Sequence, residues 1–176
     1  MSDVMNLFRY FLFSFFLFYS GTYVSAQKKH EFSRPLMGMA FRIVIYSENS
    51  SLASKGAKSA FDKVAILNKI MSDYDSTSEL SRLSNLAGSG KAARISDSLF
   101  QVLQAGQVLG GRTDGAFDVT SGASTRLWRQ ARRLKRVPPE DAIKIANNSS
   151  GYRYLKLDKS LKTAELLKDG MRLDLG

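Results

Sequence analysis

A short segment in the second half of the chain combines residue types that could contact a ligand. It reads Gly-Ala-Phe-Asp-Val-Thr over residues 115–120 and follows a glycine-rich break at residues 110–114. Glycine lets the backbone approach a ligand closely, while the Phe117 ring offers an apolar face and the Asp118 carboxylate a hydrogen-bond acceptor. Large aromatic side chains more often belong to a hydrophobic core. On its own, the segment leaves both roles of Phe117 open.

Acidic residues are the candidates for holding a hard metal ion, because Mg²⁺ prefers carboxylate and carbonyl oxygens: Asp73, Asp75, Asp118 and Asp174. For the first two, which lie in a Ser- and Asp-rich segment, we expect local hydrogen bonds that hold a loop. The sequence has one histidine, His30, and no cysteine. This composition argues against a histidine-based triad or a zinc site built from this chain. The sequence also contains neither a G-x-x-x-x-G-K-S/T phosphate loop nor a G-x-G-x-x-G following a predicted strand.

Six basic residues occur within eleven positions without one acid, in a chain of net charge +10: Arg126, Arg129, Arg132, Arg133, Lys135 and Arg136. Charge runs of this kind are usually the solvated face of a helix, and we favour that interpretation. A nucleic-acid face, which would act through counterion release, is the alternative. The export predicted below argues against nucleic acid as a partner. An acidic partner or a membrane surface stays open.

The N-terminal residues 1–26 have the pattern of a secretory signal peptide. Arg9 precedes an almost wholly apolar run at residues 10–19, and residues 24–26, Val-Ser-Ala, end in small residues at the predicted cleavage site. The apolar run is shorter than the roughly 20 residues that a membrane-spanning helix needs. Gln27, rather than a lipid-bearing cysteine, follows the cleavage site. We expect an exported protein, periplasmic or at the outer face of the inner membrane.

The part after the signal peptide is long enough for one domain with a hydrophobic core. The polar residues 27–35 are predicted to be an unstructured lead-in, and residues 36–176 to form the domain. With no cysteine, an exported fold must be held by packing alone.

Hydrophobic periodicity and turn residues predict the elements that must position these side chains. The first part of the domain is predicted to contain a strand at 36–46, a helix over 57–71, a loop at 72–76 and a short helix at 77–86. The second part is predicted to contain helices at 99–109, 124–135 and about 140–147, then strands at 152–157, 161–167 and 171–175.

The end of the chain carries two further expectations. Asp169-Gly170 is a strong hairpin signal and is predicted to join the last two strands. The order of one strand, several helices and then a run of strands favours an α+β fold, with helices packed on mostly antiparallel strands. Because the last predicted strand runs directly into Gly176, we expect the sequence to be incomplete at this end.

Four segments, taken in order, resemble motifs of the ApbE-type FAD:protein FMN transferases. Residues 37–39, Met-Gly-Met, resemble the Met-Gly-Thr that opens the family's domain. The second motif has two parts, and residues 71–74, Met-Ser-Asp-Tyr, resemble the first of them, Met-Ser-x-Tyr/Trp. Residues 78–85, Ser-Glu-Leu-Ser-Arg-Leu-Ser-Asn, resemble the Ser-x-Leu-Ser-Arg-Leu-Asn that follows.

The resemblance continues in the second half of the chain. Residues 115–120 match the family's Gly-Ala-Phe-Asp-Val/Ile-Thr, with Leu127-Trp128 in the expected place behind it. Residues 170–176 resemble the start of its Asp-Leu-Gly-Gly-Ile-Ala-Lys-Gly block. The order and spacing of all four motifs agree, so the resemblance covers residues 36–176.

The sequence also departs from the family pattern. Met39 stands where the family has threonine, and residues 121–125, Ser-Gly-Ala-Ser-Thr, stand where it has Val-Gly-Pro-Leu-Val. The lysine of the last block and the later Asp and Thr that bind metal would follow Gly176. No complete metal site is therefore assigned, and we expect the chain alone not to catalyse FMN transfer.

The resemblance implies a Mg²⁺-dependent transferase with an ApbE-like, T-fold-like architecture that acts outside the cytoplasm. It would split FAD at the pyrophosphate and attach FMN to a threonine or serine of an acceptor flavoprotein, such as a subunit of a membrane redox complex. The residues that fall on the family's FAD-contacting positions are Met37, Tyr74, Ala116, Phe117, Asp118 and Asp174. Of these, Tyr74 offers a face on which a flavin or adenine ring can stack.

Three other functions remain as alternatives. An FAD pyrophosphatase of the same family would pass FMN to water instead of a protein. A non-catalytic flavin-binding or scaffold protein would bind FAD without turnover. A basic exported adhesion domain would bind polyanions in a salt-sensitive way and would not bind flavin.

Overall fold

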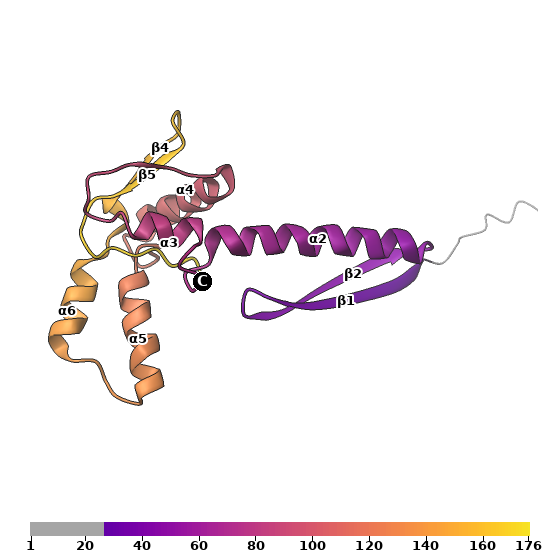
Figure 1. Cartoon of the computed structure of the whole chain (residues 1–176), viewed down its shortest axis with the longest axis horizontal. Helices are drawn as coiled ribbons and strands as arrows, with labels where there is room; N and C mark the ends of the chain where they lie inside the picture. The colour runs from indigo at the N-terminus through magenta and orange to yellow at the C-terminus, as the bar shows by residue number, and fades with distance from the viewer. Residues whose placement is uncertain (1–26) are drawn as a thin grey trace, which may run out of the picture. The chain divides into compact units, whose positions relative to one another are not determined.

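The structure, a computed structural model, describes residues 27–176 (Figure 1). The predicted signal peptide, residues 1–26, lies outside the described residues. The described chain divides into two compact units. One comprises residues 27–33 and 42–58, and the other comprises residues 34–41 and 59–176. None of the described helices is long and apolar enough to cross a membrane.

A two-stranded sheet opens the described chain. Its strands are β1 (Lys28–Leu36) and β2 (Met39–Ser47). Met37 and Gly38 connect them with φ angles of 51° and 72°. A two-residue turn with positive φ at both positions matches the twist of a hairpin. The strand predicted from residue 36 therefore begins three residues later.

The prediction of an unstructured lead-in at residues 27–35 is wrong, because this segment is most of β1. Its side chains are nearly all polar, so the sequence lacks the alternation of apolar and polar residues that predicts a strand. Polar contacts to β2 support it instead: Arg42 donates to Glu31 at 3.0 Å, and the His30 ring nitrogen Nε2 lies 3.0 Å from the Ser47 carbonyl oxygen.

Helix α2 (Ser50–Met71) follows β2. Asn49 caps it, since its side-chain oxygen accepts a hydrogen bond from the Leu52 amide at 3.0 Å. The helix predicted over 57–71 is present but begins seven residues earlier, at the cap.

The larger unit contains the other helices and a three-stranded sheet. The helices are α3 (Glu79–Ser84), α4 (Asp97–Arg112), α5 (Gly122–Leu134) and α6 (Glu140–Asn148). All four were predicted, with ends that differ by a few residues. Serine caps stabilise the N-terminal ends of α3 and α4: Ser78 accepts a hydrogen bond from the Ser81 amide at 2.9 Å, and Ser96 accepts one from the Leu99 amide at 3.3 Å.

The sheet is antiparallel throughout, in the order β3-β5-β4. Its strands are β3 (Ala93–Arg94), β4 (Leu155–Asp158) and β5 (Thr163–Leu166). Leu155 pairs with Leu166, both buried, so these two strands present an apolar face to the core. The predicted α+β class, with helices and antiparallel strands, is confirmed.

Two predictions near the end of the chain are corrected. Residues Tyr152–Tyr154 form a 3₁₀ turn, η1, before β4 instead of the start of a strand. The predicted hairpin through Asp169-Gly170 is wrong: β5 pairs with β3 and β4, and residues 171–175 are extended without joining the sheet. Their backbone instead bonds to the loop before α5 and to the start of that helix. A strand pattern indicates extended backbone, but it does not tell which segment supplies the partner.

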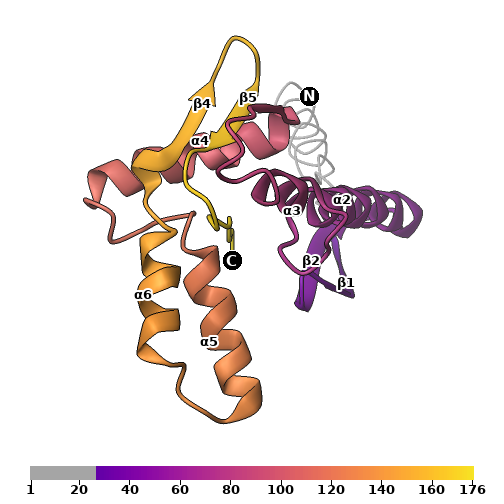
Figure 2. The same cartoon turned by 60° about the vertical axis from the view of Figure 1, so that its left-hand side comes forward.

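The core of the larger unit lies between helices α3 and α4, the sheet and residues 171–175. It consists of twelve buried side chains: Leu80, Leu83, Ile95, Leu99, Phe100, Leu103, Val119, Leu155, Ala164, Leu166, Met171 and Leu173. Figures 1 and 2 show α4 beside β4 and β5, while α5 and α6 lie side by side and extend away from the sheet. The base of α5 thus lies next to residues 171–175.

Candidate functional site

The extended segment 171–175 presents alternate side chains to opposite sides. Met171 and Leu173 are buried in the core. The intervening backbone is held by two hydrogen bonds: the Gly122 amide donates to the Arg172 carbonyl at 3.0 Å, and the Asp174 amide donates to the Val119 carbonyl at 2.9 Å. Because side chains alternate along extended backbone, Arg172 and Asp174 are turned away from the core.

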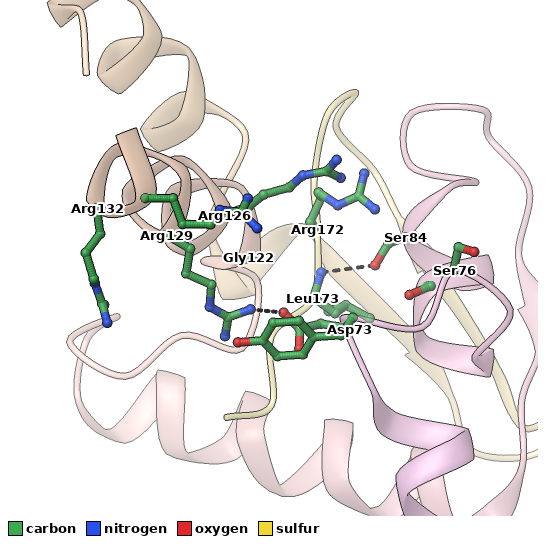
Figure 3. Close-up of a pocket in the computed structure, with 12 residues that line it drawn as sticks. Asp73, Ser76, Ser84, Gly122, Arg126, Arg129, Arg132, Arg172 and Leu173 are labelled. Carbon is green, nitrogen blue, oxygen red and sulfur yellow. Dashed lines mark hydrogen bonds and ion pairs between the residues drawn. The ribbon is translucent and has the colours of Figure 1, made fainter. Parts of the chain in front are cut away.

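Arg129 of α5 joins two acids that are far apart in the sequence. Its guanidinium donates to the Asp73 carboxylate and, at 3.2 Å, to Oδ2 of Asp174. The same guanidinium carbon lies 4.6 Å from the centre of the Tyr74 ring, a cation–π distance. Figure 3 shows Arg129 reaching from α5 toward Asp73. We call this group, Arg129 with Asp73, Tyr74 and Asp174, the arginine junction.

The surroundings of Arg129 favour the charged form of its guanidinium. Burial acts to lower its pKa, but the hydrogen bond and charge of Asp73, together with the charge of Asp174, outweigh burial and raise the pKa above its ordinary value. The guanidinium therefore stays protonated at every physiological pH. Both of its neighbouring carboxylates are thereby held in one place.

Two hollows meet around residues 174–176. The first, of about 600 Å³, is lined by Met37 and Tyr74 among others. The second, of about 580 Å³, is lined by Ala116, Phe117, Asp118 and Asp174 among others. Val102, Leu175 and Gly176 line both. We call them the paired hollows; each has the volume of a small-molecule site.

All six residues that the family resemblance marked for FAD contact thus line one or the other of the paired hollows. Tyr74 is 78% exposed and Phe117 is 44% exposed, so both residues are accessible. Phe117 is therefore not a core residue, which was the open alternative from its residue type. Val102 and Leu175 supply apolar surface shared by both hollows.

Asp118 has a structural task that sequence reasoning missed. Its Oδ1 accepts from the amide and the hydroxyl of Thr120 at 2.8 and 2.7 Å, and its Oδ2 accepts from the Tyr152 amide at 2.8 Å. The Thr120 hydroxyl also accepts from the Gly151 amide at 2.8 Å. Asp118 thereby ties the loop that carries Phe117 to the turn before β4.

A third cavity, of about 480 Å³, lies on the α5 side of the arginine junction (Figure 3). Its lining contains five arginines: Arg126, Arg129, Arg132, Arg133 and Arg172. Ser76, Ser81 and Ser84 line it as well. We call it the arginine cavity.

The interpretation of the basic run as a solvated helix face holds, because all six residues except Arg129 are exposed, but the run also lines the arginine cavity. Four of its six basic residues, Arg126, Arg129, Arg132 and Arg133, line the cavity. The signal was present in the sequence, because positions 126, 129 and 133 are spaced by three and four and so share one side of a helix. The sequence did not indicate that the segment with Arg172 faces these arginines across the cavity.

The two acids of the loop after α2 have different tasks. Asp75 behaves as predicted: its Oδ1 accepts from the Thr77 amide and hydroxyl at 2.8 and 2.7 Å. These hydrogen bonds lower the pKa of Asp75. For Asp73 the prediction of local hydrogen bonding is wrong, because its carboxylate pairs with Arg129 of α5.

The described acids do not assemble a metal site. No group of three His, Cys, Asp or Glu side chains that could hold a metal ion occurs within residues 27–176. Asp73 and Asp174 share the Arg129 cation, which occupies the position between them. Asp118 has both oxygens engaged by Thr120 and Tyr152.

Comparisons with known proteins place this geometry in context. A sequence model of the ApbE family matches residues 37–176. The FAD:protein FMN transferase of Chlamydia muridarum is 27% identical over 152 residues, which is 86% of this chain and 48% of that protein. The solved flavin transferase ApbE from Vibrio cholerae matches with a TM-score of 0.75 and 26% identity over 85% of this chain and 48% of that one.

A second solved structure has a similar fold. The apo form of the flavinyl transferase ApbE from Pseudomonas stutzeri matches with a TM-score of 0.71 and 25% identity, over 86% of this chain and 48% of that one. The chain thus spans about half the length of the relatives it matches, at 48% in each of these three cases.

Proposed function

Because this chain belongs to the ApbE family, we propose that it binds and orients FAD for the transfer of FMN from FAD to an acceptor protein. One observation supports this most strongly. Six residues that are widely separated in the sequence, and that the family resemblance marked for FAD contact, line the paired hollows: Met37, Tyr74, Ala116, Phe117, Asp118 and Asp174.

In the proposed reaction, the hydroxyl oxygen of a threonine or serine on the acceptor attacks the FAD phosphorus nearest the riboflavin. A P–O bond forms to that oxygen, the bond to the AMP phosphate breaks, AMP leaves and the hydroxyl proton is released. The acceptor is proposed to be an exported or membrane-bound redox protein. The described residues contribute by binding and orienting FAD, which is a large part of catalysis in phosphoryl transfer.

Tyr74 and Phe117 are the proposed contacts for the rings of FAD. Both side chains are accessible, and each lines a different member of the paired hollows. Aromatic pairs gain about 0.5–1.5 kcal/mol beyond the area they bury. Asp118 would act indirectly, by fixing the loop that carries Phe117. Arg129 would act in the same way on Tyr74, since its guanidinium covers one face of that ring.

Mg²⁺ is proposed as a cofactor on the family resemblance alone, and the described acids do not fit it. Asp73 and Asp174 are already paired with one shared guanidinium, and Asp118 is engaged by backbone and hydroxyl donors. We assign no described residue to Mg²⁺.

The proposal is tested by FAD affinity, measured by flavin fluorescence, in the full chain and three variants. Tyr74→Ala and Phe117→Ala should each weaken FAD binding about threefold to tenfold, because each removes a ring contact. Tyr46→Ala is the matched control, since Tyr46 is 61% exposed on β2 and lines none of the hollows described above. Equal affinities in all four proteins would overturn the proposed site.

We also propose that the protein acts after export. This rests on the signal-peptide pattern of residues 1–26. N-terminal sequencing of the protein recovered from the periplasm of an expressing bacterium should begin at Gln27. An intact Met1 on protein found only in the cytoplasm would contradict export.

A further inference from the structure

The arginine cavity carries more positive charge than its surroundings neutralise. Of its five arginines, Arg129 is paired with acids in the arginine junction. The other four, Arg126, Arg132, Arg133 and Arg172, make no ion pair with any acid of residues 27–176. The cavity lining contains one acid, Asp73, and Arg129 already engages it.

This concentration of charge is unfavourable in the absence of a ligand. Burial lowers the pKa of Arg172 and the nearby charge of Arg126 lowers it further, while the charge of Asp73 acts in the opposite direction and only partly offsets them. Two guanidinium groups from different segments, α5 and residues 171–175, are thus held close enough to repel each other. An anion bound between them would remove this repulsion.

The lining fits a phosphate group better than a carboxylate. Guanidinium forks match phosphate oxygens in bidentate geometry, and a phosphate monoester such as AMP brings a charge of about −1.5 to −2 against the single charge of a carboxylate. Hydroxyl donors are present too: Ser84, whose oxygen accepts from the Leu173 amide at 3.1 Å, can still donate its own proton. The volume of about 480 Å³ suits a small molecule.

We propose that the arginine cavity binds a phosphate-bearing small molecule through Arg126 and Arg172. The inference rests on the cavity itself and not on the proposed FMN transfer. The phosphate chemistry is common to two sources: the pyrophosphate of an FAD held in the neighbouring hollows, and a separate ligand such as free pyrophosphate or AMP. The two sources are distinguished by the ligands used in the test.

The test is isothermal titration of the full chain with inorganic pyrophosphate, AMP and FAD, each at low and high salt. Pyrophosphate or AMP should bind, raise the melting temperature and lose affinity as salt increases. Emission of Trp128, the single tryptophan of the sequence, gives a second readout from α5, next to Arg129.

Arg126→Gln and Arg172→Gln should each weaken pyrophosphate binding about tenfold or more, because a charged hydrogen-bonding partner is lost. Arg136→Gln is the matched control: it removes the same charge from the same basic run, but Arg136 does not line the cavity. Arg126 is exposed, so its variant should fold, and an unchanged or higher melting temperature without ligand is expected because repulsion with Arg172 is relieved.

The outcomes separate the possibilities. If Arg126→Gln weakens pyrophosphate and FAD alike, the phosphate comes from FAD; if it weakens pyrophosphate or AMP alone, the ligand is separate. Either result supports the proposal.

Equal losses of affinity in Arg126→Gln and Arg136→Gln would overturn the proposal, because they would indicate non-specific charge attraction. Absence of binding by the folded chain would overturn it too, as would tighter binding of a hexaglutamate peptide, which would indicate an acidic protein partner. FAD binding that depends on Phe117 but not on Arg126 leaves the proposed function unaffected.

Discussion

Arg129 is the residue on which the geometry of the candidate site depends most. Its guanidinium connects the loop after α2, through Asp73 and Tyr74, with the extended segment 171–175, through Asp174. The side chains of Arg129, Asp73 and Asp174 are 26%, 20% and 9% exposed, so these charges are largely withdrawn from water. A partly buried carboxylate that loses its partner keeps its desolvation penalty without the compensating attraction.

Arg129→Met should therefore destabilise the chain by roughly 1–3 kcal/mol, the cost of leaving partly buried charged groups unsatisfied. Urea denaturation followed by circular dichroism measures this. Arg132→Met is the control, because Arg132 lies on the same helix and makes no ion pair with acids of the described chain. Equal free energies of unfolding for the two variants would show that the arginine junction contributes little to stability.

Sequence reasoning identified single residues better than it identified their partners. Tyr74 and Phe117 were found through motifs, and both are accessible where a ligand could contact them. The junction was missed because Arg129 is 56 residues from Asp73 and 45 from Asp174, and a run of arginines does not indicate which acid it meets. The hydrogen bond from the Tyr152 amide to Asp118, which joins residues 34 apart, was missed for the same reason.

At the scale of elements, the contact between α4 and the loop at residues 118–120 sets the position of Phe117. Gly106 of α4 lies against Val119, which is buried. A Cβ added at Gly106 would lie 2.5 Å from Cγ1 of Val119. Valine is stiff at its first side-chain torsion and cannot turn away at low cost. Because Gly106 has no side chain, helix α4 can pack this closely against the loop.

Gly106→Ala should lower the free energy of unfolding by roughly 1–3 kcal/mol through overpacking, although alanine favours helix. Gly111→Ala, on the same helix, is the matched control, because the nearest atom to its added Cβ is Cε2 of Tyr152 at 3.9 Å. That variant should not be destabilised, because its added Cβ meets no close atom and Gly111 lies in the last turn of α4. Thermal unfolding of both variants measures the two effects; a stabilised Gly106→Ala would contradict the close packing.

Several helices were predictable as elements because a periodic apolar face coincides with a local start signal, whereas α5 has no side-chain cap hydrogen bond. The serine caps of α3 and α4 are examples. The strand β1 was not predictable from its own residues, since its polar sequence is stabilised by pairing with β2. Residues 171–175 were recognised as extended, but their partners, Val119 and Gly122, come from the loop before α5 and the start of that helix. Such long-range pairing cannot be recognised from the residues of one segment alone.

At the scale of the whole molecule, the net charge of +10 favours anionic ligands over cationic ones. The distribution of the charge matters more than the sum. Five arginines line one cavity, next to hollows lined by aromatic and aliphatic side chains. FAD has both kinds of chemistry, apolar rings and a pyrophosphate. The fold class and the family could be predicted from the sequence, whereas this juxtaposition required the structure.

The most direct test of the central claim, that the paired hollows bind FAD, is a crystal structure of the full chain with FAD. We expect rings of FAD in van der Waals contact with Tyr74 in one hollow and with Phe117 in the other, with the hydrogen bonds of Asp118 to Thr120 and Tyr152 intact. Ordered FAD bound elsewhere on the chain, with both hollows empty, would contradict the account.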